Sequence, residues 1–157
     1  TVTLSEGVTR IGKYAFFNCN MLSSVSLPST LNEIGSRAFQ QCESLSSITI
    51  PASVKTIALS AFDSCANLKY VTFEEGSQLQ TIGDYAFEGC ENLKQVTLGI
   101  GVTLIKDFAF SECFALRNIV YEGNIEEFYK IHIDETAFQG CPKIKVECED
   151  GVLLIND

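Results

Sequence analysis

The sequence has little of what catalysis or membrane insertion would require. It contains one histidine, His132, so any Ser-His-Asp or Cys-His arrangement would have to be built around that residue. The phosphate-binding pattern GxxxxGK[ST], the zinc pattern HExxH and the esterase pattern GxSxG are all absent. No run approaches the about 20 apolar residues that a membrane-spanning helix needs. We therefore expect neither an enzyme nor a membrane span.

Positive charge is also scarce. The chain has 11 lysines and arginines against 20 aspartates and glutamates, which gives a net charge of −9. Residues 1–60 hold three acids and four bases (+1), whereas residues 61–157 hold seventeen acids and seven bases (−10). Nucleic-acid binding depends on rows of Lys and Arg that neutralise phosphates. We therefore expect no nucleic-acid partner and interpret the acidic half as a solvated surface.

The sequence is rich in repetition. An Ala-Phe pair recurs six times, at steps of 23, 23, 25, 23 and 28 residues. The pairs are Ala15-Phe16, Ala38-Phe39, Ala61-Phe62, Ala86-Phe87, Ala109-Phe110 and Ala137-Phe138. Such a period is typical of a solenoid, in which each unit buries its apolar face against its neighbours. We expect about six coils around one core, which the 46% hydrophobic content can supply.

Around each Ala-Phe pair the apolar residues recur at helical spacing. Ile34, Ala38, Cys42 and Leu45 illustrate a pattern that returns in every unit with small changes. A spacing near 3.6 residues predicts short helical or 3-10 turns. The cysteines at this repeat position are Cys19, Cys42, Cys65, Cys90, Cys113 and Cys141.

After the leucine of each unit the apolar period changes to two. The alternating pairs are Val25 and Leu27, Ile48 and Ile50, Val71 and Phe73, Val96 and Leu98, and Ile119 and Tyr121. One short strand per coil, always in the same direction, predicts a parallel sheet. A second apolar pair, such as Leu31 with Ile34, predicts a minor strand on the return path. Insertions at residues 74–78 and 122–132 follow the main strand and predict loops on one surface.

The repeat pattern does not cover the whole sequence evenly. Val2 and Leu4 match Val25 and Leu27, so the sequence begins in mid-repeat, and the pattern ends near residue 147. We expect residues 1–147 to form the solenoid and residues 148–157 to form a non-repeat C-terminal tail with a strand over residues 151–155. We expect a monomeric fragment of a longer protein.

The units together follow L-x-x-V-x-L-P-x-x-L-x-x-I-G-x-x-A-F-x-x-C, which resembles the leucine-rich repeat of the BspA-like class over about residues 2–147. The insertion after Tyr121 resembles the Y-x-G-x-x-E-E-W insertion of that family, with Phe128 in place of tryptophan. The resemblance implies an α/β solenoid: a curved, right-handed leucine-rich-repeat coil with its parallel sheet on the concave face. It also implies an extracellular or cell-surface protein that adheres to host matrix proteins, to other cells or to surfaces.

Seven cysteines invite a metal or redox interpretation, but their spacing does not support it. Separations of 23 to 28 residues lack the paired CxxC spacing of a zinc site. The pattern favours a buried column of small apolar residues, with Cys148 outside it as a candidate free or reactive thiol. Adjacent acids such as Glu126 and Glu127 favour solvated loop charge over calcium ligands or glycosidase carboxylates. We expect no cofactor and no metal.

The outward residues of the predicted sheet are the candidate binding site. Alternation turns one residue in two away from the core, and three cations stand in a row at the strand starts. We define the sheet-face stripe as Lys69, Tyr70, Thr72, Lys94, Gln95, Thr97, Arg117 and Asn118. Such a stripe suits an acidic or hydroxyl-rich partner. The alternative is that these residues simply suit exposed strands and that the cations offset the acidic loops.

The pattern as a whole indicates a non-enzymatic binding module. The expected partner is a protein, host matrix proteins included, or a glycan, held by the sheet face and the loop insertions. Two alternatives stay open: a structural spacer that displays other domains, and a solenoid enzyme that acts on polysaccharides. The enzyme should show converging acids and cations in a cleft, whereas the spacer should tolerate replacement of the stripe.

Overall fold

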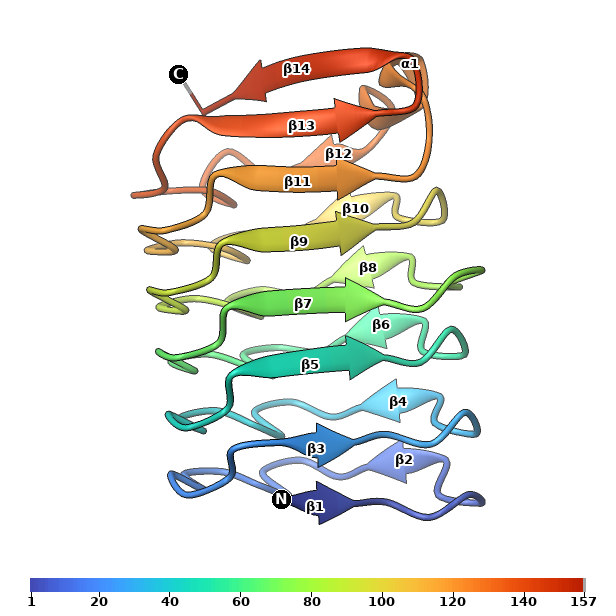
Figure 1. Ribbon diagram of the computed structural model, residues 1–157, viewed down its shortest axis with the longest axis vertical. Helices are drawn as coiled ribbons and strands as arrows, with labels where there is room; N and C mark the ends of the chain where they lie inside the picture. Colours follow the sequence, from blue (N-terminus) through green and yellow to red (C-terminus); the bar gives the residue numbers. More distant parts are fainter. Residues whose placement is uncertain (157) are drawn as a thin grey trace.

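The chain winds upward in about six coils, and each coil adds strands on two opposite sides. The computed structural model describes residues 1–156. In Figure 1 the chain runs along a front strand, turns at the right, returns along a rear strand and rises to the next level, which makes the coil right-handed. This is the usual hand of crossovers between parallel strands. The predicted right-handed solenoid of about six coils is confirmed. It is a β-solenoid and not the predicted α/β solenoid, because the described coils consist almost entirely of strands and turns.

The sheet at the front of Figure 1, called here the main sheet, has the order β14-β13-β11-β9-β7-β5. Its strands are β5 (Ser47–Ile50), β7 (Tyr70–Phe73), β9 (Gln95–Leu98), β11 (Asn118–Tyr121), β13 (Ile144–Cys148) and β14 (Gly151–Ile155). Neighbouring strands from β5 to β13 are parallel, and β14 is antiparallel to β13. On the same side, β1 (Val2–Thr3) and β3 (Val25–Ser26) form a separate parallel pair.

The rear sheet consists of two-residue strands in the order β12-β10-β8-β6-β4-β2. They are β2 (Arg10–Ile11), β4 (Glu33–Ile34), β6 (Thr56–Ile57), β8 (Thr81–Ile82), β10 (Leu104–Ile105) and β12 (His132–Ile133). All of its pairings are parallel, with equivalent isoleucines opposite each other, as in Ile34 with Ile57. The predicted minor strand is confirmed.

The structure corrects the predicted helical or 3-10 turns around the Ala-Phe pairs. In the second coil, Arg37 and Gln41 have φ values of 57° and 62°, in the left-handed region that interrupts a helix. The amides of Arg37 and Phe39 donate to carbonyls of the next coil, at 2.9 and 2.8 Å. Every second amide of this segment therefore donates to a carbonyl of the next coil, and the segment forms a series of tight turns instead of a helix. Within residues 1–156 the one helix is α1 (Ile125–Phe128), in a segment predicted as a loop.

The interior contains two columns of identical side chains. The phenylalanines of the six Ala-Phe pairs stack along the axis, with successive ring centroids 5.0–5.3 Å apart and interplanar angles of 1–5°. Beside them, the repeat cysteine of each coil from the second onward donates its S–H to a phenylalanine carbonyl oxygen one coil earlier, at 3.0–3.2 Å. All seven cysteines are free thiols. The predicted column is buried at Cys42, Cys65, Cys90 and Cys113, whereas Cys19 and Cys141 in the first and last units are half-buried.

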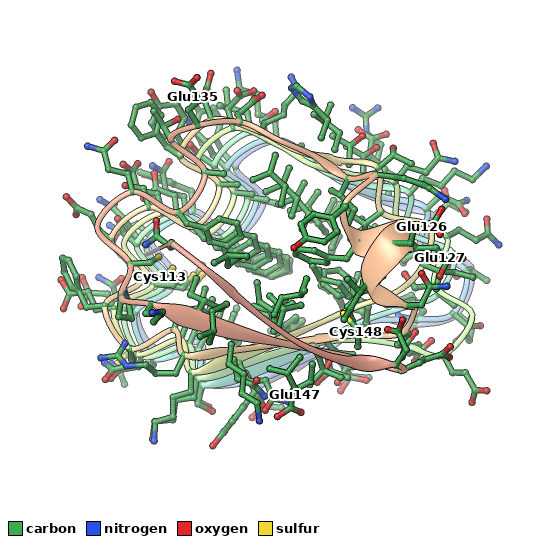
Figure 2. All side chains as sticks on the ribbon, turned by 90° about the horizontal axis from the view of Figure 1, so that it is seen from above. Cys113, Glu126, Glu127, Glu135, Glu147 and Cys148 are labelled. Carbon is green, nitrogen blue, oxygen red and sulfur yellow. The ribbon has the colours of Figure 1, made fainter. Side chains whose placement is uncertain are left out.

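The last coil is covered by α1 and β14. Asn124 and Glu127 form a reciprocal capping box at the start of α1, and the Ile125 amide donates to Oδ1 of Asp150 at 2.8 Å. The rings of Tyr121 and Phe128 meet edge to face, 5.4 Å apart. Seen along the axis, α1 covers one part of the core, with Glu126 and Glu127 on its outer side (Figure 2). The strand expected over residues 151–155 is β14, and the expected end of the repeats at residue 147 lies within β13.

Candidate binding face of the main sheet

Alternation along the strands gives the main sheet one buried and one exposed face. In β7, Val71 and Phe73 are buried, whereas Tyr70 and Thr72 are exposed. The parallel register then aligns equivalent residues of successive strands, so each outward position becomes a column along the solenoid axis. Seen along the axis, Glu147 projects outward from this face, whereas Cys113 lies inside the coil (Figure 2). The predicted stripe residues lie together on this outer face.

The first column of the stripe contains its three cations. The Lys94 amide donates to the Lys69 carbonyl at 2.9 Å, and the Arg117 amide donates to the Lys94 carbonyl at 3.3 Å, so the three residues are ladder neighbours. All three side chains are exposed. Within residues 1–156, the ion pairs involve other bases: Arg10, Lys106, Lys130, His132 and Lys145. The column therefore places three cations side by side, and none of them has an acidic partner in the described part of the chain.

Arg117 is partly turned toward its own coil. Its Nη1 donates to the carbonyl oxygen of Phe114 at 2.8 Å, a contact that leaves the other guanidinium donors for a partner. The side chains of Lys69 and Lys94 are exposed and make no hydrogen bond or ion pair within residues 1–156.

The second column is polar and carries one exposed aromatic ring. Tyr70, Gln95, Asn118 and Lys145 occupy successive positions, and the Tyr70 side chain is 48% exposed. Nδ2 of Asn118 donates to Oε1 of Gln95 at 3.2 Å. Oδ1 of Asn118 is buried and receives no hydrogen bond from residues 1–156. Thr72 and Thr97 follow in the third column.

Sequence reasoning missed Lys145 as the continuation of the second column. It lies on β13, where it forms an ion pair with Glu147 two residues on. The hydrogen bond and the charge of Lys145 lower the pKa of the Glu147 carboxyl. Because this cation already has an acidic partner, Lys145 differs from Lys69 and Lys94. The alternation of Ile144, Lys145 and Val146 was the signal that could have located it.

The remaining candidate groups from the sequence are His132, the possible metal ligands and Cys148. Nε2 of His132 approaches Oδ1 of Asp134 at 2.9 Å, with the imidazole exposed. No group of three or more histidine, cysteine or acidic residues in the described part of the chain could hold a metal ion. Cys148 is a partly buried free thiol at the end of β13; burial, and then the charge of Asp150, raise its pKa. A raised pKa keeps this thiol neutral and disfavours the reactive thiolate.

Comparison with known proteins identifies the family of repeat proteins to which this solenoid belongs. The BspA type leucine rich repeat region, in six copies, matches residues 1–79 and 75–146. The chain belongs to this family. A comparison with curated protein sequences finds no match. No helix within residues 1–156 has the length and apolar character to cross a membrane.

Solved structures of bacterial proteins share the fold. A leucine-rich cell surface protein from Faecalibacterium prausnitzii is 36% identical, with a TM-score of 0.79 over 85% of this chain and 35% of that chain. A leucine-rich repeat protein from Eubacterium ventriosum is 20% identical, with a TM-score of 0.73 over 89% of this chain and 42% of that one. The leucine-rich repeat protein of T. pallidum is 28% identical, with a TM-score of 0.71 over 92% of this chain and 72% of that one. The chain thus spans less than half the length of the first two.

Proposed function

We propose that this chain is a non-enzymatic module of a cell-surface or secreted protein that binds a partner protein through the sheet-face stripe. The observation that carries the proposal is the column of Lys69, Lys94 and Arg117, three exposed cations without acidic partners in residues 1–156. The description of the F. prausnitzii relative as a cell surface protein supports the proposed location. Adhesion to host matrix proteins or to other cells is the role we propose for the module.

The chemistry of the stripe favours an acidic segment of the partner. Backbones of neighbouring strands lie about 4.8 Å apart, so the three cations begin as close neighbours and repel one another. An anionic partner relieves that repulsion and adds charge-assisted hydrogen bonds to the lysines and the arginine. Tyr70 contributes an exposed ring beside the cations, a residue type enriched in interfaces. The net charge of the whole chain is −9 even with these three cations included, so the rest of the surface repels an acidic partner and directs it to this face.

The test compares two variants with matched changes in charge. One variant replaces Lys69, Tyr70, Lys94 and Arg117 with alanine. The control replaces Arg10, Lys106 and Lys130, whose partners are Glu33, Asp84 and Glu126, so it also loses three cations but away from the stripe. Binding is measured by biolayer interferometry against an oligoglutamate peptide and a panel of purified extracellular-matrix proteins.

We expect the wild type and the control to bind, the stripe variant to lose binding, and the wild-type affinity to fall as salt is raised. Circular dichroism should show the same unfolding transition for the stripe variant, because all four side chains are exposed. Equal binding by both variants would exclude the stripe. Absence of any wild-type binding to the panel would favour the spacer over the adhesin.

A further inference from the structure

The main sheet is interrupted between its second and third coils. β3 pairs with β1 and β5 pairs with β7, but no ladder pair within residues 1–156 joins β3 to β5. The backbone bond from the Ser46 amide to the Ser23 carbonyl is long, at 3.5 Å, whereas the equivalent bond from Lys69 to Ser46 measures 2.9 Å. The rear strands β4 and β6 do pair, and Phe39 still stacks on Phe62. The opening is therefore local and lies on the outer face.

This opening forms a cleft of about 250 Å³, which we call the β3–β5 cleft. Its polar lining comes from Ser24 and Ser26 on one side, Ser47 and Thr49 on the other, and Glu74 just after β7. The hydroxyls of Ser26, Ser47 and Thr49 have no hydrogen-bond partner in the described part of the chain. Oε2 of Glu74 accepts from the Ala52 amide at 3.2 Å, which fixes the carboxylate at the rim and leaves Oε1 for a ligand.

Side-chain size explains why the hollow occurs here and not higher on the sheet. Ser24 and Ser47 occupy the column that continues with Tyr70 and Gln95, whose longer side chains cover the strands there. The neighbouring inward residues differ as well: Val25 and Leu27 are only partly buried, whereas Ile48 and Ile50 of β5 are buried. The cleft therefore combines short hydroxyl side chains with apolar surface of the second coil.

We propose that the β3–β5 cleft binds one neutral sugar unit, free or at the end of a glycan. Its donors and acceptors are hydroxyls and one carboxylate, which match the hydroxyls of a saccharide, and Val25 and Leu27 offer apolar surface to the C–H groups of the ring. Its volume falls below the about 300–1,000 Å³ of sites for larger ligands, which suits a single ring. Glu74 is the charged group of the lining, so anionic sugars are disfavoured.

The site is independent of the stripe proposed above, and the experiment keeps the two apart. Saturation-transfer difference NMR is recorded on this chain with glucose, galactose, mannose and N-acetylglucosamine, and with sialic acid as the anionic comparison. Ser47→Tyr fills the cleft with the residue that the same column carries at Tyr70, so the fold accommodates it. Gln95→Tyr makes the same addition two strands away and serves as the control. Glu74→Gln retains the shape and removes the charge.

We expect transfer to at least one neutral sugar, loss of that signal in Ser47→Tyr, a weaker signal in Glu74→Gln and an unchanged signal in Gln95→Tyr. Replacement of Lys94 and Arg117 with alanine should leave the sugar signal unchanged, whatever its effect on protein binding. Three results would overturn the proposal: no neutral sugar gives transfer to the wild type, sialic acid gives transfer equal to theirs, or Ser47→Tyr retains the signal.

Discussion

Phe62→Ala removes a ring from the middle of the phenylalanine column. Phe62 is fully buried and stacks on Phe39 and Phe87, with both centroid distances 5.2 Å. Loss of a buried phenylalanine side chain costs about 3–5 kcal/mol through lost transfer energy and the cavity left behind. Two stacked neighbours, each contributing about 0.5–1.5 kcal/mol, place the cost toward the upper end of that range. Against a domain stability of about 5–15 kcal/mol, this is a large loss.

Urea unfolding followed by circular dichroism measures the effect. With a slope of about 1–3 kcal/mol per molar urea, the midpoint should fall by about 1–5 M. Phe114→Ala is the matched control, because Phe114 is 51% exposed and its loss should change the stability little. Because each coil contacts only its neighbours, the variant should also unfold less cooperatively, with the first coils separating from the rest. An unchanged midpoint for Phe62→Ala, or equal losses in both variants, would refute the stacked interior.

Three further predictions concern the thiols and the exposed face. In the native chain at pH 8, the four buried repeat cysteines (Cys42, Cys65, Cys90 and Cys113) should resist alkylation detected by mass spectrometry, whereas all seven cysteines react after denaturation; equal native rates would contradict the column. Burial raises the pKa of Cys42 from about 9 to about 11, so its stabilising contribution is complete below pH 9. The urea midpoint should therefore fall between pH 9 and 11, and Cys42→Ala should weaken that dependence. Ser26→Lys should cost under about 0.5 kcal/mol in the same assay, because Ser26 is exposed.

The period of the sequence was sufficient to predict the coils and the side chains in their interior. Ala-Phe pairs and cysteines recur once per unit, and a solenoid is the arrangement that lets every copy bury the same side chains. The alternation in segments such as Ser47–Ile50 likewise predicted which residues face outward. These features follow from the burial of apolar surface, which the order of residue types determines directly.

The turns could not be predicted in the same way. Left-handed residues such as Arg37 and Gln41, four positions apart, produce the same inward spacing as a short helix, so periodicity alone does not distinguish the two. Amide hydrogen bonds to the next coil favour the left-handed turns over a short helix, and these bonds form only once the coils are stacked. The interruption between β3 and β5 also depends on how neighbouring coils meet. A single unit carries no signal for it.

The stacked interior, the sheet-face stripe and the β3–β5 cleft all depend on the register in which equivalent residues of successive coils meet. Aromatic NOEs test that register most directly, in a chain with site-specifically labelled phenylalanines. The account predicts NOEs from the Phe62 ring to the rings of Phe39 and Phe87, which lie 23 and 25 residues away in the sequence but at centroid distances of 5.2 Å. Absence of both contacts, with NOEs to non-equivalent positions instead, would contradict the stacked columns and with them the placement of Lys69 and Lys94 on one face.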